Sequence, residues 1–452
     1  MCTMSKCKIR IITILLTLIT WLSSSADVII VDNIKYGISK DVVICNGIAD
    51  TSIICSDIVI PDSIKVNGIN LPVCYISGGA FEGIHNIHSI RLPETIKRIY
   101  MASFAACDNL DCINIPTSLQ KIPDNAFYDS NLVSISVSPQ NPYYFIDGSN
   151  AIINKETNEL IAGSAKTVIP TTISTLGEKA FSKRRKLKQI SIPSSVVLIQ
   201  NDCFMNCDSL ISVDFSDDNT GNCNLYIATG AFMNCNSLQF VNLPNRLDTL
   251  GCAFVGCSQL SQIYIPRNVS YIAGAQFGYC TNMQSVIVDS NNKKYDSRNN
   301  CNAIIETKTK KLSSACPATV IPNGIKTIGE FSYTEVAIDS IFIPNSVKNI
   351  EVYAFQHCAV RSVVIPKRIN RIDLSSFGSC NNLRNIYLMQ NTPPILTDLG
   401  NVLDADDLLD ALENTTEYDC LKNVKIYVPS KSQKKYKRHP VWKVFNIVSM
   451  KN

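Results

Sequence analysis

The chain has 452 residues, of which 42 are basic and 38 acidic, and its formal charge is +4 at pH 7. Three of the basic residues, Lys6, Lys8 and Arg10, lie in the first ten positions, so the remainder carries 39 basic against 38 acidic residues. This balance excludes a nucleic acid or an acidic membrane surface as a partner held by bulk electrostatics.

The N-terminal segment is typical of a secretory signal peptide. Lys6, Lys8 and Arg10 precede an apolar stretch over 11–22 that is too short to span a bilayer. Small residues over 24–26 then predict a signal peptide over 1–26 that is cleaved after Ala26. No later segment is apolar for long enough to cross a membrane. We therefore expect a secreted or cell-surface product without a membrane span.

A repeat follows an N-terminal β cap, which the alternation of apolar and polar residues predicts over 27–57. The repeat region is predicted over 58–390, and neighbouring copies in unbroken runs lie 22 or 23 residues apart. The repeat's Phe-x-x-Cys occurs as Phe104/Cys107, Phe204/Cys207, Phe232/Cys235, Phe254/Cys257, Phe277/Cys280, Phe355/Cys358 and Phe377/Cys380. Such a period predicts a solenoid, in which each coil buries its apolar side only against its neighbours.

One full coil reads Leu-x-x-Ile-x-Ile-Pro-x-Ser-Val-x-x-Ile-x-x-x-Ala-Phe-x-x-Cys. Ile-x-Ile has the period of two of a strand, and the proline after it removes a ladder donor and ends the strand. A second short extended piece follows, and Ala-Phe then turns the chain back through a short helical segment. Stacked coils therefore place their strands side by side in parallel.

Two longer coils are predicted near 138–166 and 289–318. The spacing from Phe127 to Phe181 and from Phe277 to Phe331 is 54 residues in both cases, and both intervals contain Asn-Ala-Ile-Ile. We interpret them as coils that carry a hairpin. A turn-rich insertion over 216–224 predicts an exposed loop. Residues 391–452 predict a C-terminal cap in which Trp442 and Phe445 close the last coil.

The cysteines of the repeat point the same way in successive coils. Coils roughly 4.8 Å apart would allow a bridge, but the parallel Cβ directions disfavour one. We expect buried, reduced thiols that act as small apolar residues. Local bridges stay open among the cysteines outside the column, which are Cys45, Cys55, Cys74, Cys112, Cys203, Cys223, Cys252, Cys301, Cys316 and Cys420.

The repeat resembles the BspA-like leucine-rich repeat family, also described as the Treponema pallidum type. The resemblance covers about 32–447 and includes a Thr-Pro-Pro at 392–394, as in exported proteins of Bacteroidales. It implies a leucine-rich repeat right-handed superhelix, with a parallel β-sheet on the concave face, short irregular or helical turns outside, and caps at both ends. It also implies a surface or secreted protein that binds other molecules and has no catalytic residues. The chain departs from the pattern at Glu330-Phe331, where alanine is replaced and no cysteine follows.

An outward position between the two inward residues of each strand offers a candidate binding surface. Along the chain this position is first mostly polar and then apolar or aromatic. The predicted partner-binding residues are Tyr264, Ile287, Val320, Phe342, Val364 and Tyr387. An apolar stripe suggests a partner site, with the aromatic residues as anchors. The alternative is that such residues simply favour exposed strand positions.

The sequence contains no strong catalytic or metal-binding motif. The four histidines are His85, His88, His357 and His439, and His85-x-x-His88 with Cys74 is a weak metal pattern better explained as a solvated loop. The sequence contains no nucleophile elbow, zinc-protease helix or phosphate loop. The acidic stretch from Asp404 to Asp410 lacks the glycine of a calcium loop. We expect no enzyme activity, no cofactor and no metal.

The prediction for function is a secreted or cell-surface scaffold that binds a macromolecule, first a host or bacterial surface protein in the manner of an adhesin. A glycan-binding accessory of a polysaccharide-harvesting system is the alternative, because Tyr264 lies near Asn242 and Gln262. A structural role in the envelope is a third possibility. The sequence does not set the oligomeric state, and a monomer is the expectation.

Overall fold

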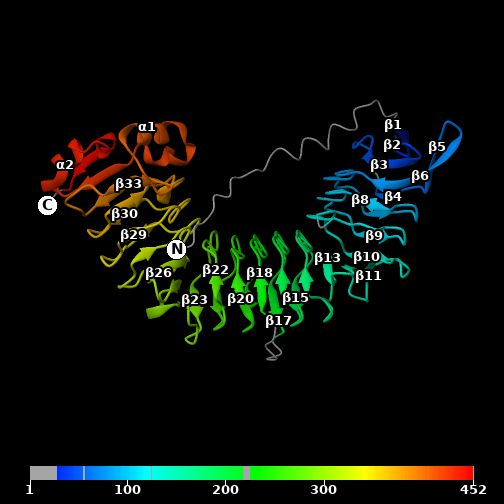
Figure 1. Cartoon of the computed structure of the whole chain (residues 1–452), viewed down its shortest axis with the longest axis horizontal. Helices are drawn as coiled ribbons and strands as arrows, with labels where there is room; N and C mark the ends of the chain where they lie inside the picture. The colour runs from blue at the N-terminus through cyan, green and yellow to red at the C-terminus, as the bar shows by residue number, and fades with distance from the viewer. Residues whose placement is uncertain (1–27, 54–55, 124, 217–223, 451–452) are drawn as a thin grey trace, which may run out of the picture.

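The computed structural model describes residues 28–53, 56–123, 125–216 and 224–450. The predicted signal peptide, Cys55, Cys223 and nearly all of the predicted 216–224 loop lie outside the described residues. The described chain is a curved arch of stacked coils, with N-terminal strands at one end and the helices α1 (Ala405–Asn414) and α2 (Gln433–Arg438) at the other (Figure 1). The predicted solenoid of short parallel strands is confirmed.

A first column of strands is formed by the Ile-x-Ile segments. Its parallel pairs include β9 with β10, in which Ile113 faces Ile135 and both side chains are buried. The column consists of β4 (Asp57–Val59), β7 (Ser89–Arg91), β9 (Cys112–Ile115), β10 (Ser134–Val137), β15 (Gln189–Ile192), β17 (Ser212–Phe215), β19 (Phe240–Asn242), β21 (Gln262–Ile265), β23 (Ser285–Val288), β28 (Ser340–Ile341), β30 (Ser362–Ile365), β32 (Asn385–Leu388), β35 (Lys425–Val428) and β36 (Asn446–Ser449).

A second column follows the proline turns. Its strands are two to four residues long and also pair in parallel, as in Thr175 with Leu198. It consists of β8 (Arg98–Ile99), β14 (Thr175–Leu176), β16 (Leu198–Ile199), β18 (Leu225–Ile227), β20 (Leu247–Leu250), β22 (Tyr271–Ile272), β27 (Thr327–Ile328), β29 (Asn349–Ile350), β31 (Arg371–Asp373) and β33 (Ile395–Asp398).

The Ala-Phe turns form a third seam between coils. Phe104 N donates to Ala126 O at 3.0 Å and Ala106 N donates to Tyr128 O at 2.9 Å, and the same pair of bonds recurs along the chain. The coils lie so close here that a Cβ on Gly256 would come within 2.1 Å of Asn234 Oδ1 of the preceding coil. In Figure 1 the arrows of β18, β20 and β22 point toward the hollow of the arch, where these turns follow.

The position of the first sheet therefore differs from the expectation of a sheet on the concave face. The two strand columns form the flanks of the arch, and the Ala-Phe turns lie on its hollow side (Figure 1). The physical reason is the spacing of the coils: the inner side of a curved stack needs the closest approach. Small residues such as Ala, Gly and Ser in these turns permit that approach.

The repeat phenylalanines and cysteines fill the interior. Neighbouring rings stack with centroids 4.7 to 5.6 Å apart. The thiol of each repeat cysteine donates to the carbonyl of the aromatic residue one coil earlier, with Sγ···O distances of 2.9 to 3.2 Å. All described cysteines are free, so the predicted reduced column is confirmed, and the described cysteines outside it form no bridge either.

We expect the protein to lose stability between pH 9 and about 12. Burial raises the pKa of Cys107 and of Cys358 from 9.0 to about 12. The unfolded thiol ionises near 9 while the folded one stays neutral, so this stabilisation is complete below pH 9 and is lost as the pH rises toward 12. Urea midpoints at neutral pH and at about pH 10.5 measure the loss. Cys107→Ala should show a shallower decline, and an equal decline in both proteins would contradict the assignment.

The two longer coils contain antiparallel hairpins, as predicted. The first is built from β11 (Tyr144–Phe145), β12 (Ala151–Asn154) and β13 (Glu159–Gly163). The second is built from β24 (Tyr295–Asp296), β25 (Ala303–Glu306) and β26 (Lys311–Ala315), with the 3₁₀ turn η1 (Arg298–Asn300) before β25. They divide the interior into three apolar clusters, of which the first spans 34–162, the second 151–316 and the third 301–447.

A side-chain amide bonds to the preceding proline turn at each interruption and before the C-terminal cap. Asn141 Nδ2 donates to Pro116 O at 2.7 Å and to Leu119 O at 3.0 Å, which are carbonyls of the preceding proline turn. Asn292 makes the same two bonds to Pro266 and Val269. Gln390 makes them to Pro366 and Ile369 before the C-terminal cap. We call these three residues the amide plugs.

Arg184 bridges the first interruption. It occupies the cysteine position of its coil, and its side chain is fully buried. Nε donates to Gly163 O at 2.7 Å, and Nη1 donates to Ser182 O at 2.8 Å and to Ser130 O. The guanidinium therefore reaches carbonyls on both sides of the hairpin coil, which a thiol could not do.

After the second interruption the predicted alignment of the repeat is wrong by two residues. Tyr333, and not Phe331, takes the place of the repeat phenylalanine, because Tyr333 stacks on Phe355 with centroids 5.1 Å apart and Cys358 Sγ donates to Tyr333 O. Phe331 instead stacks on Tyr353 at 5.0 Å. The longer hairpin coil displaces the repeat by two residues, a shift that the matching spacing of 54 concealed.

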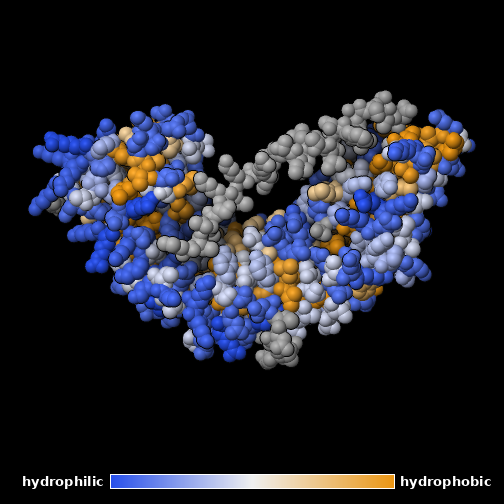
Figure 2. All heavy atoms as spheres, in the orientation of Figure 1, coloured by the Kyte–Doolittle hydropathy of each residue, from blue (hydrophilic) through white to orange (hydrophobic). Residues whose placement is uncertain are grey.

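The N-terminal end is β-rich. It contains β1 (Val28–Val31), β2 (Ile34–Ser39), β3 (Val42–Ile48), β5 (Ser63–Val66) and β6 (Ile69–Ile76). Strands β1 to β3 form an antiparallel meander. Strand β3 pairs in parallel with β6, and β6 pairs in parallel with β8 of the second column. Figure 2 shows apolar side chains gathered at this end, where Val28, Ile30 and Ile69 are exposed.

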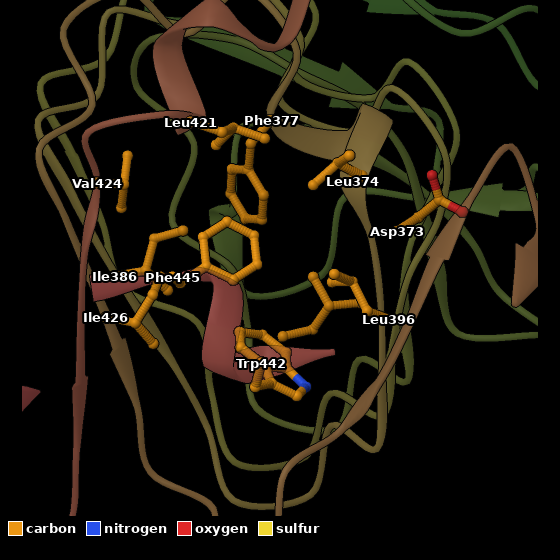
Figure 3. A pocket seen from close by; sticks show the side chains of 11 residues that line it. Asp373, Leu374, Phe377, Ile386, Leu396, Leu421, Val424, Ile426, Trp442 and Phe445 are labelled. Atoms are coloured by element: carbon orange, nitrogen blue, oxygen red, sulfur yellow. The ribbon is translucent and has the colours of Figure 1, made fainter. Parts of the chain in front are cut away.

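The C-terminal end contains the helices and four 3₁₀ turns. Its remaining elements are β34 (Asn401–Val402), η2 (Leu374–Phe377), η3 (Thr416–Leu421), η4 (Ser430–Ser432) and η5 (Trp442–Val444). Trp442 is buried, and its Nε1 donates to Pro394 O at 2.7 Å. Figure 3 shows Trp442 and Phe445 facing Phe377 and Leu396 around an apolar cavity of about 30 Å³. No helix among the described residues is long and apolar enough to cross a membrane.

Candidate functional site

The predicted partner-binding residues lie on the outer surface of the first column. Phe342 is 78 % exposed, Val320 70 % and Tyr264 48 %, while Ile287 and Val364 are also exposed and Tyr387 is half-buried. The structure does not gather them into one patch. They form a C-terminal row and a separate pair, with Val320 between the two.

The C-terminal row, as we call it, consists of Phe342, Val364, Tyr387 and Tyr427. Val364 lies opposite Tyr387 and Tyr387 opposite Tyr427 in the parallel register, and the two tyrosine rings stack with centroids 4.7 Å apart. Phe342 follows directly after Ser340 and Ile341, which pair with Ser362 and Val363, so it comes next to Val364. The row is therefore continuous across four coils.

A polar row runs beside the apolar one. Two residues before each member of the C-terminal row the side chain points to the same face. Those positions are Ser340, Ser362, Asn385 and Lys425, which are also in register with one another. An apolar strip bordered by polar side chains matches the core and rim of a protein interface.

The separate pair is Tyr264 and Ile287, which lie opposite each other on β21 and β23. The Tyr264 hydroxyl is hydrogen-bonded to Asp289, which raises the pKa of Tyr264. The pKa of Asp289 is lowered, first by the backbone N–H of Asn291 and then by Tyr264. Asp289 belongs to the next coil, so this contact links the two coils.

Val320 lies where the second hairpin coil meets the first column. It belongs to no strand, and its backbone N donates to Cys301 O at 3.1 Å. Between Ile287 and Phe342 the chain makes two turns of the solenoid, one past Asn302 in the hairpin coil and one past Val320. This extra winding explains why the predicted stripe is divided.

Two residues of this surface were missed by the sequence analysis. Phe240, which is 56 % exposed, points outward two positions before Asn242, and Tyr427 extends the C-terminal row. A second outward position per strand gives a signal for Phe240. Tyr427 lies beyond the last repeat cysteine, in the segment treated as a cap, so the repeat pattern gives no signal for it.

His85, His88 and the acidic segment have local partners. His85 Nδ1 lies 3.2 Å from Asp108 Oδ2 and His88 Nδ1 lies 3.5 Å from Asp111 Oδ2, whereas Cys74 is buried. Within the described residues no three His, Cys, Asp or Glu side chains converge as metal ligands. Asp404 caps the N-terminus of α1 through a capping box with Asp407.

Fold and surface together define a leucine-rich repeat solenoid. A family model described as BspA type leucine rich repeat region matches residues 61–162, 152–224, 222–316 and 305–399. These matches span most of the chain, which therefore belongs to the BspA type leucine-rich repeat family. The comparison with curated proteins gave no match.

Solved structures with similar architecture come from several bacteria. A leucine rich cell surface protein from Faecalibacterium prausnitzii A2-165 is 19% identical, with a TM-score of 0.43, and the alignment covers 95% of this chain and 96% of that chain. A leucine-rich repeat protein from Bacteroides ovatus ATCC 8483 is 19% identical, with a TM-score of 0.38 and coverage of 94% and 100%. The pneumococcal vaccine antigen PcpA is 15% identical, with a TM-score of 0.39 and coverage of 94% and 99%. At these scores the likeness carries no argument about partners or sites.

Proposed function

We propose that the protein is an exported binding scaffold that recognises a protein on a host or bacterial surface through the C-terminal row. The observation that carries the proposal is the continuity of the row: Val364, Tyr387 and Tyr427 are in register on neighbouring coils, and Phe342 directly follows the strand that pairs with the coil of Val364. A Phe side chain left 78 % exposed loses the free energy that its burial would supply, about 1.5–3 kcal/mol. A partner that covers the row recovers that free energy.

The chemistry of the row favours a protein partner. Aromatic residues supply contact area at a small cost in side-chain entropy, and the stacked Tyr387 and Tyr427 rings are already ordered. The bordering serines, Asn385 and Lys425 can form the hydrogen bonds of a rim. Export, by the N-terminal segment predicted over 1–26, places this surface in contact with other cells.

We expect the double substitution Phe342→Asp with Val364→Asp to lower partner binding at least about tenfold, because two charges would be placed in the apolar centre of the interface. Both side chains are exposed, so the melting temperature should hardly change. Binding of the purified protein to an array of extracellular-matrix and bacterial surface proteins measures the effect.

Val59→Asp with Val168→Asp is the matched control. Both valines are exposed on the first-column face and lie far from the row along the chain. The control should bind as the unmodified protein does. Equal loss in both double variants, or unchanged binding in both, would reject the row as the site.

A further inference from the structure

The hydrogen-bonded ladder of the first column is open between β19 and β21. One sheet ends with β19 (order β15-β17-β19), and a separate sheet begins with β21 (order β21-β23). The same two coils stay joined elsewhere: Thr249 pairs with Tyr271 in the second column, and Gly256 N donates to Gly278 O at 2.8 Å in the Ala-Phe seam. Between these two coils the opening is therefore confined to the first column.

A pocket of about 230 Å³ occupies this opening. Phe240 and Asn242 line it from β19, Gln262 and Tyr264 from β21, and Ile287 from β23. Phe240 and Tyr264 both stand about half exposed, while the inward residues Val241 and Ile263 close the floor. Two aromatic side chains thus flank a recess whose edges carry amides.

The chemistry of the lining is neutral. Among its residues, three amides, Gln239, Asn242 and Gln262, supply both donors and acceptors, and no Lys, Arg, Asp or Glu takes part. Two of the side chains are held in place from outside the pocket: Asn242 Nδ2 lies 3.4 Å from Asp214 Oδ1, and the Tyr264 hydroxyl is bonded to Asp289. Both neighbours restrict side chains that a ligand in the recess would meet.

We propose that this opening binds a neutral sugar ring of a glycan. A pyranose has apolar C–H faces that pack on aromatic rings and a girdle of hydroxyls that need both donors and acceptors, which Phe240, Tyr264 and the amides provide. The volume holds about one ring. A sulfated or sialylated sugar fits less well, because the lining offers no cation to an anionic group. The site is separate from the C-terminal row and does not depend on the function proposed for it.

Tyr264→Ala and Phe240→Ala test the site in the full chain. The probes are neutral plant, yeast and mucin oligosaccharides on a glycan array that also carries sulfated and sialylated members, followed by titration of the best neutral probe. Each substitution is expected to weaken binding of that probe about tenfold or more, since each removes one stacking surface. Gln262→Ala should weaken it as well.

Tyr271→Ala is the matched control. Tyr271 is as exposed as Tyr264 and sits on the next strand of the same coil, but in the second column, where the ladder is closed. Its substitution should leave glycan binding unchanged, and so should Phe342→Asp. The proposal is overturned if no neutral glycan binds, if anionic glycans bind better, or if Tyr264→Ala and Tyr271→Ala have the same effect.

Discussion

Arg184→Met is expected to destabilise the protein by about 3–5 kcal/mol, because three buried carbonyls lose a donor at about 1–3 kcal/mol each. The guanidinium is fully buried and donates to carbonyls of Gly163, Ser182 and Ser130. Methionine fills a similar volume but donates nothing, so these carbonyls would stay buried without their donor. The same change would weaken the junction between the first and second apolar clusters.

Urea unfolding followed by circular dichroism measures the effect. Because neighbouring coils supply most of the stability of a repeat protein, a weakened junction should also split one transition into two. Arg184→Lys keeps the positive charge but loses the planar set of donors of the guanidinium. Its urea midpoint should therefore lie between those of the unmodified protein and of Arg184→Met. Arg185→Met is the control: its side chain is 47% exposed and 3.7 Å from Asp108, so the change should stay within about 0.5 kcal/mol. Equal midpoints for the two Met variants would contradict the role of Arg184.

Trp442→Ala should cost a similar amount, about 3–5 kcal/mol, through loss of packing at the C-terminal end. Trp442 is buried against Phe445 and Tyr436, with ring centroids 5.6 and 5.9 Å away, and borders the apolar cavity of Figure 3. Truncation would enlarge that cavity and leave Pro394 O without its indole donor. Hydrogen exchange should therefore become faster in β35 and β36 first, and only later in the middle of the arch.

Two further variants sharpen this test. Trp442→Phe keeps most of the packing and removes the bond to Pro394, so it should cost only about 1 kcal/mol. Lys443→Ala changes the exposed neighbour and should have no measurable effect. If exchange in β35 and β36 stays as slow in Trp442→Ala as in the unmodified protein, the cap does not depend on this residue.

Periodicity predicted the parts of the fold that repeat. The inward isoleucines, the stacked phenylalanines and the reduced cysteines follow from one 22- or 23-residue pattern, and Tyr264, Phe342 and Val364 are exposed as their alternation requires. Features that occur once could not be obtained this way. Arg184, for example, occupies a position that is a cysteine in other coils. The residues around it do not reveal that the preceding coil lacks an Ala-Phe turn.

The opening between β19 and β21 shows the same limit more strongly. The two coils have the ordinary spacing, from Leu238 to Leu260, so the sequence gives no mark of a broken ladder. Whether two strands stay hydrogen-bonded depends on how the curvature of the whole stack is shared among its seams. The hollow side of the arch was misplaced for a related reason: curvature is a property of the stack, and a single coil does not contain it.

The amide plugs have a consequence for how the length of such a solenoid can change. Each plug donates to two carbonyls of the preceding proline turn, from Asn141, Asn292 and Gln390. At the end of such a segment these two carbonyls are therefore not open to a foreign strand. Duplication or loss of a whole plugged segment would lengthen or shorten the molecule while every junction keeps its chemistry, which offers a physical route to relatives of different span.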